Sequence, residues 1–394
     1  MSATLTSPFG AQALRRYMAF ALLAFMAGFI LSPSLRLVAN LCIVFLLLPG
    51  AFALVRGDAR LPRCTPASLC WGLLFFWCLI QGAWFSAAPG GGQYAKHLAL
   101  AFLFMLCASA LCDPAYFRSE RFARSAFWLL TAYVLLAALM QWLTGGYQPP
   151  RTMHITLFWT IAATNYFTGA LLVAFFALAM PCWLKAGDWR HFTLALVLIL
   201  FILSFIFQQR SALVALALVL AVGVIIAFRL SACCGKRLVL ILAIFVALAV
   251  LLWLFVPGTH SLETRGSSGR TELWRKHLLE WQRCGLWSGC GPRFQSALIF
   301  RDRPLMHPHN LFLSFAVLNG GVGLACLLLA IGTTLIQALR NRDPWGLVFL
   351  AGLTVMAFSG GYFLMRTTPS WVLLLLPAAL ILNPQPRCSA RPEH

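Results

Sequence analysis

The residues best suited to chemistry stand directly before one apolar segment. His309 and Asn310 precede the run that begins at Leu311, and Pro308 separates them from a second histidine, His307. An imidazole exchanges a proton near neutral pH, whereas arginine and lysine do not. We therefore expect His309 to act as a general base, with Asn310 orienting its ring or capping the helix. His307 is the rival base, which Pro308 places on the extended side of the turn.

Three arginines are candidates to bind an anion near this histidine. Arg210 follows Gln209 where one apolar run turns into the next, and Arg265 and Arg270 flank a Gly/Ser turn. Guanidinium forks bind phosphate oxygens, and the free N–H groups of a helix start favour negative charge. We expect a phosphate-binding site there. The alternative is that these arginines anchor the chain to lipid headgroups.

An amphipathic helix is expected directly after the Gly/Ser turn. Ser267 or Ser268 could cap it. Trp274, Leu278 and Trp281 recur at helical spacing and would share one face. Because tryptophan favours the headgroup level of a bilayer, the helix is expected at the membrane interface.

The composition shows what kind of scaffold must hold these residues. The chain has 394 residues, of which 61% are hydrophobic and only 10% are charged, and its formal net charge is +20. A soluble domain is about 25% charged, and a disordered chain has low hydrophobicity, so both classes are excluded. A nucleic-acid-binding protein is excluded as well, because the cations are scattered between apolar runs. The sequence indicates an all-α polytopic membrane protein.

Twelve segments are apolar enough to be membrane spans, since a crossing helix needs about 20 mainly apolar residues. They are residues 17–34, 37–55, 67–87, 98–112, 125–144, 160–183, 192–208, 211–228, 238–256, 310–338, 345–365 and 371–383. The first is expected to be a retained anchor and not a cleaved signal peptide. The tenth is long enough to be broken at Gly320 and Gly321.

The cations orient these spans. With the N-terminus in the cytoplasm, the cytoplasmic segments hold 17 Lys and Arg, and the short loops of the opposite side hold 5. This distribution obeys the positive-inside rule and places both termini in the cytoplasm. The other 8 cations lie in residues 257–308, beside only four acidic residues. A single integral domain follows: spans 1–9 in residues 1–256, a partly helical outer loop in residues 257–308, and spans 10–12 with a tail in residues 309–394.

The cysteines and the absent motifs limit the chemistry further. Of 13 cysteines, only Cys284 and Cys290 share the outer loop, where they are either a disulfide or two buried thiols. The sequence has no C-x-x-C pair of pairs and no H-E-x-x-H motif. We therefore expect no metal site and no cofactor.

A base and several anion-binding arginines at an outer face suggest a transfer reaction. That face has no ATP or nucleotide sugar, so the donor must arrive already activated and carried in the lipid. A polyprenyl-pyrophosphate-linked sugar fits: arginines would bind the pyrophosphate and stabilise the leaving group, and His309 would deprotonate an acceptor hydroxyl. The lack of Asp-x-Asp or paired loop carboxylates argues against metal-assisted sugar transfer and against hydrolysis by two carboxylates.

The order and spacing of short motifs over residues 205–325 resemble the O-antigen ligase superfamily. This group contains lipopolysaccharide O-antigen ligases, O-antigen polymerases and pilin oligosaccharyltransferases. The motifs are Gln209-Arg210-Ser211, Ser268-Gly269-Arg270 followed by Trp274, Gly289-Cys290-Gly291-Pro292-Arg293-Phe294, and His309-Asn310 running into Asn319-Gly320-Gly321. The N-terminal spans resemble the family only as hydrophobic helices.

The resemblance implies a metal-independent, inverting glycosyltransferase with a GT-C-type helical fold in the bacterial inner membrane. It would transfer O-antigen from undecaprenyl pyrophosphate to lipid A-core at the periplasmic face. His309 matches the family's essential histidine, Arg210 and Arg270 match its key arginines, and Arg265 is a weaker match. Gln209, Asn310 and His307 would help to bind substrate.

Three alternatives remain, the simplest of which is a membrane scaffold whose basic loop binds anionic headgroups. An O-antigen polymerase would use the same donor with a second lipid-linked chain as acceptor. A transporter would carry charges or broken helices at mid-membrane, and these spans are largely free of ionisable groups in their middles.

Overall fold

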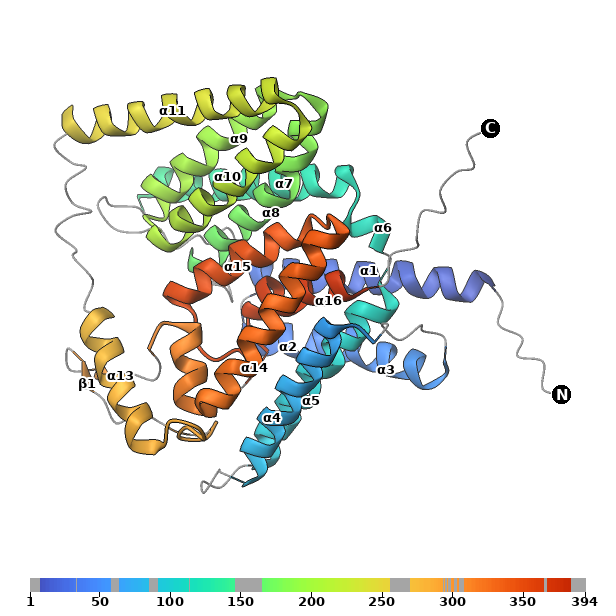
Figure 1. The fold of residues 1–394 in the computed structure, drawn as a ribbon. Helices are drawn as coiled ribbons and strands as arrows, with labels where there is room; N and C mark the ends of the chain where they lie inside the picture. The colour runs from blue at the N-terminus through green and yellow to red at the C-terminus, as the bar shows by residue number, and fades with distance from the viewer. Residues whose placement is uncertain are drawn as a thin grey trace.

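The chain is seen in a computed structural model that describes residues 8–32, 34–57, 64–84, 91–112, 114–145, 165–255, 270–292, 294, 296, 299–300, 303–304, 308–364 and 367–383. These residues are helical except for short connections and one two-residue β-ribbon (Figure 1). In chain order the elements are α1 (Pro8–Leu31), α2 (Leu35–Cys42), η1 (Ile43–Leu47), α3 (Leu48–Val55), α4 (Pro66–Trp84), α5 (Gly91–Leu111), α6 (Pro114–Phe117), α7 (Glu120–Leu143), α8 (Asn165–Ala186), α9 (Trp189–Phe201), η2 (Ile202–Ile206), α10 (Arg210–Leu230), α11 (Ala232–Phe255), α13 (Arg270–Cys284), β1 (Ile299–Phe300), β2 (Arg303–Pro304), α14 (Leu311–Asn341), α15 (Trp345–Ser359), η4 (Trp371–Leu375) and α16 (Leu376–Leu382).

The expectation of a polytopic membrane protein is confirmed by the length and hydropathy of the helices. Nine helices within the described ranges are long and apolar enough to cross a membrane. They are Gln12–Leu31, Leu35–Val55, Pro66–Ala83, Gly92–Leu111, Glu120–Leu143, Tyr166–Ala186, Trp189–Ile206, Arg210–Leu230 and Leu311–Asn341. The helix α11 and the shorter apolar helices Trp345–Phe358 and Trp371–Leu382 coincide with the other three expected spans.

The centre of the bundle is α8. Buried residues make up 89% of its span, against 50% or less for every other candidate span in the described chain. Its sequence is apolar on all sides, which is typical of a helix enclosed by others. Alanines such as Ala170, Ala174 and Ala177 are fully buried and let neighbouring backbones come close. The helices α7, α10 and α15 pack around it.

Two π-helical turns in the described chain end two residues before a proline. The turn η1 precedes Pro49, and η4 precedes Pro377. Proline lacks an N–H, and its ring clashes with the carbonyl four residues earlier. That carbonyl lies inside the π turn in both cases, so the wider turn accommodates the ring without ending the helix in the membrane.

The break expected in the tenth span is confirmed. Gly320 has φ 68° and ψ −175° inside α14, so the chain leaves the helix there and resumes it. The carbonyls freed by the break accept hydrogen bonds from elsewhere: Val317 from Cys290 N at 2.7 Å, and Leu318 from Gly291 N at 3.0 Å. The connection that follows α13 therefore completes the backbone of a membrane helix.

One end of the bundle is joined by an arginine. Arg118 Nη2 lies 2.5 Å from Asp343 Oδ2 and donates to Leu380 O at 2.7 Å. Beside it, Trp345 Nε1 donates to Phe117 O at 3.0 Å. These contacts hold together the α6–α7, α14–α15 and α16 boundaries. We call this end the Arg118 end.

The opposite end carries α13. There Trp77 Nε1, near the end of α4, donates to Asn319 O at 3.0 Å, and Gln81 Nε2 donates to Ser288 O at 2.5 Å. The hydroxyl of Tyr94, in the first turn of α5, is 2.7 Å from that of Tyr362. Figure 1 shows α13 beside the first part of α14 at this end, which we call the α13 end. Segments that the charge pattern assigned to the same side thus meet in space.

A first prediction concerns the break in α14. Gly320→Ala is expected to lower the free energy of unfolding by about 2–4 kcal/mol, because its positive φ disfavours a Cβ and that Cβ would collide with Trp287 O. Gly332→Ala, on the same helix, meets nothing within 4 Å and is expected to be neutral or to stabilise by up to about 1 kcal/mol. Thermal unfolding of both variants in one detergent checks this, and equal midpoints would contradict it.

A second prediction concerns the ion pair at the Arg118 end. Asp343→Ala is expected to cost about 3 kcal/mol or more, because the Asp343 side chain is 0% exposed and its loss leaves Arg118 without that carboxylate. Glu272→Ala removes an exposed pair with Lys276 and is expected to cost under about 1 kcal/mol. Unfolding titrations in a denaturing detergent measure both. A Glu272→Ala loss as large as that of Asp343→Ala would show that burial is not the cause.

Candidate functional site

The amphipathic helix expected after the Gly/Ser turn is α13, and the face that it packs against the protein carries polar side chains. Leu273, His277 and Glu280 are buried, spaced four and three residues apart. Of the side chains expected to share one apolar face, Leu278 is 43% exposed and Trp281 is half-buried. The helix therefore turns a stripe with two ionisable side chains towards the protein and leaves leucines outward. Hydropathy alone could not reveal this, because a buried polar pair looks like a solvated face in a sequence.

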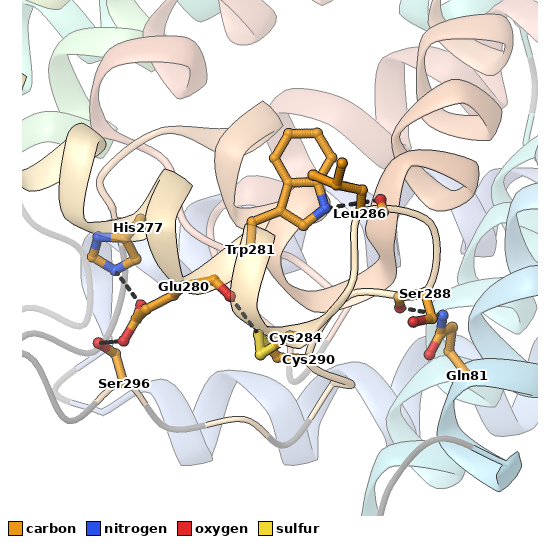
Figure 2. The surroundings of a disulfide bond; sticks show 9 residues. All are labelled: Gln81, His277, Glu280, Trp281, Cys284, Leu286, Ser288, Cys290 and Ser296. Carbon is orange, nitrogen blue, oxygen red and sulfur yellow. Dashed lines mark hydrogen bonds and ion pairs between the residues drawn. A yellow bond between two sulfur atoms is a disulfide. The ribbon is translucent and has the colours of Figure 1, made fainter.

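A disulfide closes the connection that follows α13. Cys284, the last residue of the helix, is bonded to Cys290, so the pairing considered in the sequence is present (Figure 2). Two carbonyls between the cysteines accept hydrogen bonds. Leu286 O accepts one from Trp281 Nε1 at 3.0 Å, and Ser288 O accepts one from Gln81 Nε2 of α4. The covalent link and these bonds fix the C-terminal end of α13 against α4 and the break in α14.

The N-terminal part of α13 lies against the start of α14. Trp274 Nε1 donates to Pro308 O at 3.0 Å, directly before His309. Asn310 is the N-cap of α14: its Oδ1 accepts from Leu313 N at 3.0 Å. Of the two roles expected for Asn310, the structure shows helix capping. His309 itself has φ 53°, a conformation that costs energy outside glycine and is often found at functional sites.

The surroundings of His309 favour its neutral form. The pKa of His309 lies below its ordinary value, first because packing removes part of the hydration of the imidazole, and then because the positive charge of Arg270 and the nearby His277 oppose protonation. His309 nonetheless keeps solvent access. A neutral, accessible imidazole can accept a proton at neutral pH, as a general base must. The structure thus brings Arg270 and His309 together, as the sequence predicted.

Behind this pair is a buried polar row that the sequence reasoning missed. His277 Nδ1 donates to Leu273 O at 2.9 Å, so its Nε2 points onward to Glu280 Oε2, 4.0 Å away. The other oxygen of Glu280 accepts from Ser296 Oγ at 2.7 Å (Figure 2). Neither His277 Nε2 nor Glu280 Oε2 has a hydrogen-bond partner among the described residues. The spacing Leu273, His277, Glu280 on one helix face was the only signal for this row in the sequence.

Arg210 is the first residue of α10 and is exposed. Gln209 before it is 2% exposed: its Nε2 donates to Tyr166 O at 2.9 Å, at the start of α8. The C-terminal end of α8 lies near Asp188, which pairs with Arg124 beside the Arg118 end. The start of α8, with Tyr166, therefore lies at the α13 end, and so does Arg210. Gln208 adopts φ 48°, directly after the π turn η2. Strained backbone and π turns both recur at functional sites.

Several predicted residues lie outside the described residues. These are Arg265, His307, and the possible caps Ser267 and Ser268. Their roles stay predictions. The choice between His309 and His307 as base also stays open on this ground, although the environment of His309 suits the role.

Three of the described candidates share one structural property. Arg210 begins α10, Arg270 begins α13, and His309 stands next to the N-cap of α14. A helix start carries a partial positive charge and unsatisfied N–H groups, which attract anions. Arg270 can therefore bind an anionic group next to the base His309, and Arg210 marks another helix start at the same end of the bundle. Among the described residues, no three His, Cys, Asp or Glu side chains gather closely enough to hold a metal ion.

Comparison with known proteins gives no further information on the chain: no protein-family model matches it, and no curated protein sequence does.

The electrostatic coupling at this site predicts a titration shift. Arg270→Gln is expected to raise the pKa of His309 towards its ordinary value, because a repelling charge is removed while the partial desolvation remains. Lys276→Gln, also on α13 but paired with Glu272, is the matched control and is expected to leave the pKa where it is. Histidine NMR titration in detergent or nanodiscs measures both. A His309 pKa unchanged by Arg270→Gln would show that the two side chains do not interact.

Proposed function

We propose that this chain is an O-antigen ligase: a glycosyltransferase that moves O-antigen from undecaprenyl pyrophosphate to the lipid A-core oligosaccharide. One observation carries the proposal: Arg270 and His309 lie together where α13 and α14 begin, and the imidazole is biased towards its neutral form. A pyrophosphate binder next to a base is what this transfer requires. The motif resemblance over residues 205–325 supports the same reading.

In the proposed reaction His309 accepts the proton of an acceptor hydroxyl. The oxygen attacks the anomeric carbon of the donor sugar, a new glycosidic bond forms, and the bond to the pyrophosphate oxygen breaks. Attack opposite the leaving group inverts the anomeric configuration. Arg270 and Arg210 stabilise the charge that develops on the pyrophosphate, aided by the helix starts they occupy. The donor supplies the activation, so the proposal involves no metal and no cofactor.

The break in α14 positions the elements that carry the proposed reaction. The connection that closes with the Cys284–Cys290 disulfide fills the break at Gly320. We infer that α13 is thereby held at the membrane surface. Leu278, Leu279, Leu286 and Trp287, at 43%, 45%, 51% and 75% exposure, project from this end. Apolar side chains with tryptophan suit the interface, where a polyprenyl-linked donor presents its pyrophosphate.

The finer topology belongs to the proposal too. We infer twelve spans in a GT-C-type arrangement, with the α13 end in the periplasm and the Arg118 end and both termini in the cytoplasm of a bacterial inner membrane. The support is the grouping of segments at the two ends together with the positive-inside distribution of cations. The loop and the spans then form one integral domain.

Reconstituted transfer with both acceptors tests the function. Purified chain is given undecaprenyl-pyrophosphate-linked O-antigen together with lipid A-core. Transfer to lipid A-core is expected, and it should persist in EDTA. Lengthening of the donor without transfer to lipid A-core would identify an O-antigen polymerase instead. Transport of the donor without any new glycosidic bond would favour the transporter alternative.

His309→Ala is expected to lower the transfer rate by about 10²–10⁴-fold, the usual contribution of a general base. His191→Ala is the matched control, because His191 is an exposed histidine beside Asp188 and away from the α13 end. It should transfer at the parental rate. Normal transfer by His309→Ala, with loss only in His307→Ala, would move the base to His307.

A further inference from the structure

A second candidate site lies away from the α13 end. A groove of about 740 Å³ runs between α1, α7 and α8. Its walls are apolar along most of their length, from Leu23 and Met26 of α1 to Leu171 and Phe175 of α8. This volume is within the range of ligand pockets, about 300–1,000 Å³. Leu31 and Leu129 line it and are 52% and 71% exposed, so the groove opens on the outer surface of the bundle.

The length of the groove fits one leaflet of a bilayer. Its lining along α7 extends from Arg121 to Tyr133. Twelve residues of helix rise about 18 Å. Half of a hydrocarbon core of about 30 Å is about 15 Å. Since α7 is one of the candidate membrane spans, a groove that starts at the headgroup level would extend to about mid-membrane.

The cation and two of the hydroxyl side chains of the groove stand at its headgroup end, which Tyr116, Ser119 and Arg121 line. Ser125 lies one turn further along α7, and Tyr133, at the inner end, donates to Ile30 O at 3.5 Å. The neighbouring arginines are neutralised, Arg118 by Asp343 and Arg124 by carboxylates that include Asp188. No hydrogen bond or ion pair engages Arg121 within the described part of the chain. Arg121, the one cation among the described residues that line the groove, is therefore available to a ligand.

We propose that this groove binds an anionic phospholipid of the adjacent leaflet, with an acyl chain along α7 and its phosphate at Arg121. Two observations favour this occupant. The groove has a cation at its headgroup end and mainly apolar walls beyond it, which matches the charged head and the apolar chains of a phospholipid. Its length along α7 also matches one leaflet. Basic pockets between membrane helices bind such headgroups. The site is at the Arg118 end of the bundle, opposite His309, so it does not depend on the function proposed above.

Native mass spectrometry of the purified full chain tests the proposal, with phosphatidylglycerol and phosphatidylcholine of identical acyl chains as probes. The parental chain is expected to bind phosphatidylglycerol about fivefold more tightly, the effect of one interfacial cation. Arg121→Gln should abolish that preference. Ala126→Phe, which narrows the groove, should weaken the binding of both lipids. Arg229→Gln, an exposed arginine at the end of α10, is the matched control and should keep the preference.

Three results would overturn the proposal. Equal binding of the two lipids by the parental chain would remove the role of charge. A phosphatidylglycerol preference that survives Arg121→Gln would place the binding elsewhere. A dimer that Ala126→Phe dissociates, without any effect on lipid binding, would make the occupant a second copy of the chain.

Discussion

The break in α14 is the constraint on which the rest of the α13 end depends. A membrane helix interrupted at Gly320 leaves carbonyls that hydrocarbon cannot satisfy. The N–H groups of Cys290 and Gly291 supply those bonds, so the connection after α13 must dock at that height and in that register. The disulfide from Cys284 then holds the end of α13 at the docking point. A single backbone requirement thus positions a helix that lies outside the membrane spans.

The chemistry of the site follows from this docking. Because α13 is held at both ends, by the disulfide and by the Trp274–Pro308 bond, its first residue is kept beside His309. Two helix starts then converge, and Arg270 adds a full charge to their partial charges. Packing lowers the pKa of His309, and the same Arg270 charge that would attract a pyrophosphate lowers it further. One arrangement therefore serves both anion binding and base catalysis in the function we propose.

The two ends of the bundle use arginine differently. At the Arg118 end, Arg118 and Arg124 pair with carboxylates and join distant helix boundaries. At the α13 end, Arg210 and Arg270 begin helices, where the local field already favours an anion. Arg121 lies at the Arg118 end, but, like Arg210 and Arg270, it is proposed to bind an anion. The cations behind the net charge of +20 therefore have different roles at different places in the fold.

The sequence by itself determined the helices, the break at Gly320 and the pairing of Arg270 with His309 as candidates, because hydropathy, periodicity and helix-start signals are local. It did not determine which face of α13 is buried, so the row from His277 to Glu280 was missed. Nor did it indicate that Arg118 meets Asp343, 225 residues later. Those contacts join segments far apart in the chain. Only the packing of helices around α8 decides which of them meet, and residue spacing along a chain does not encode that packing.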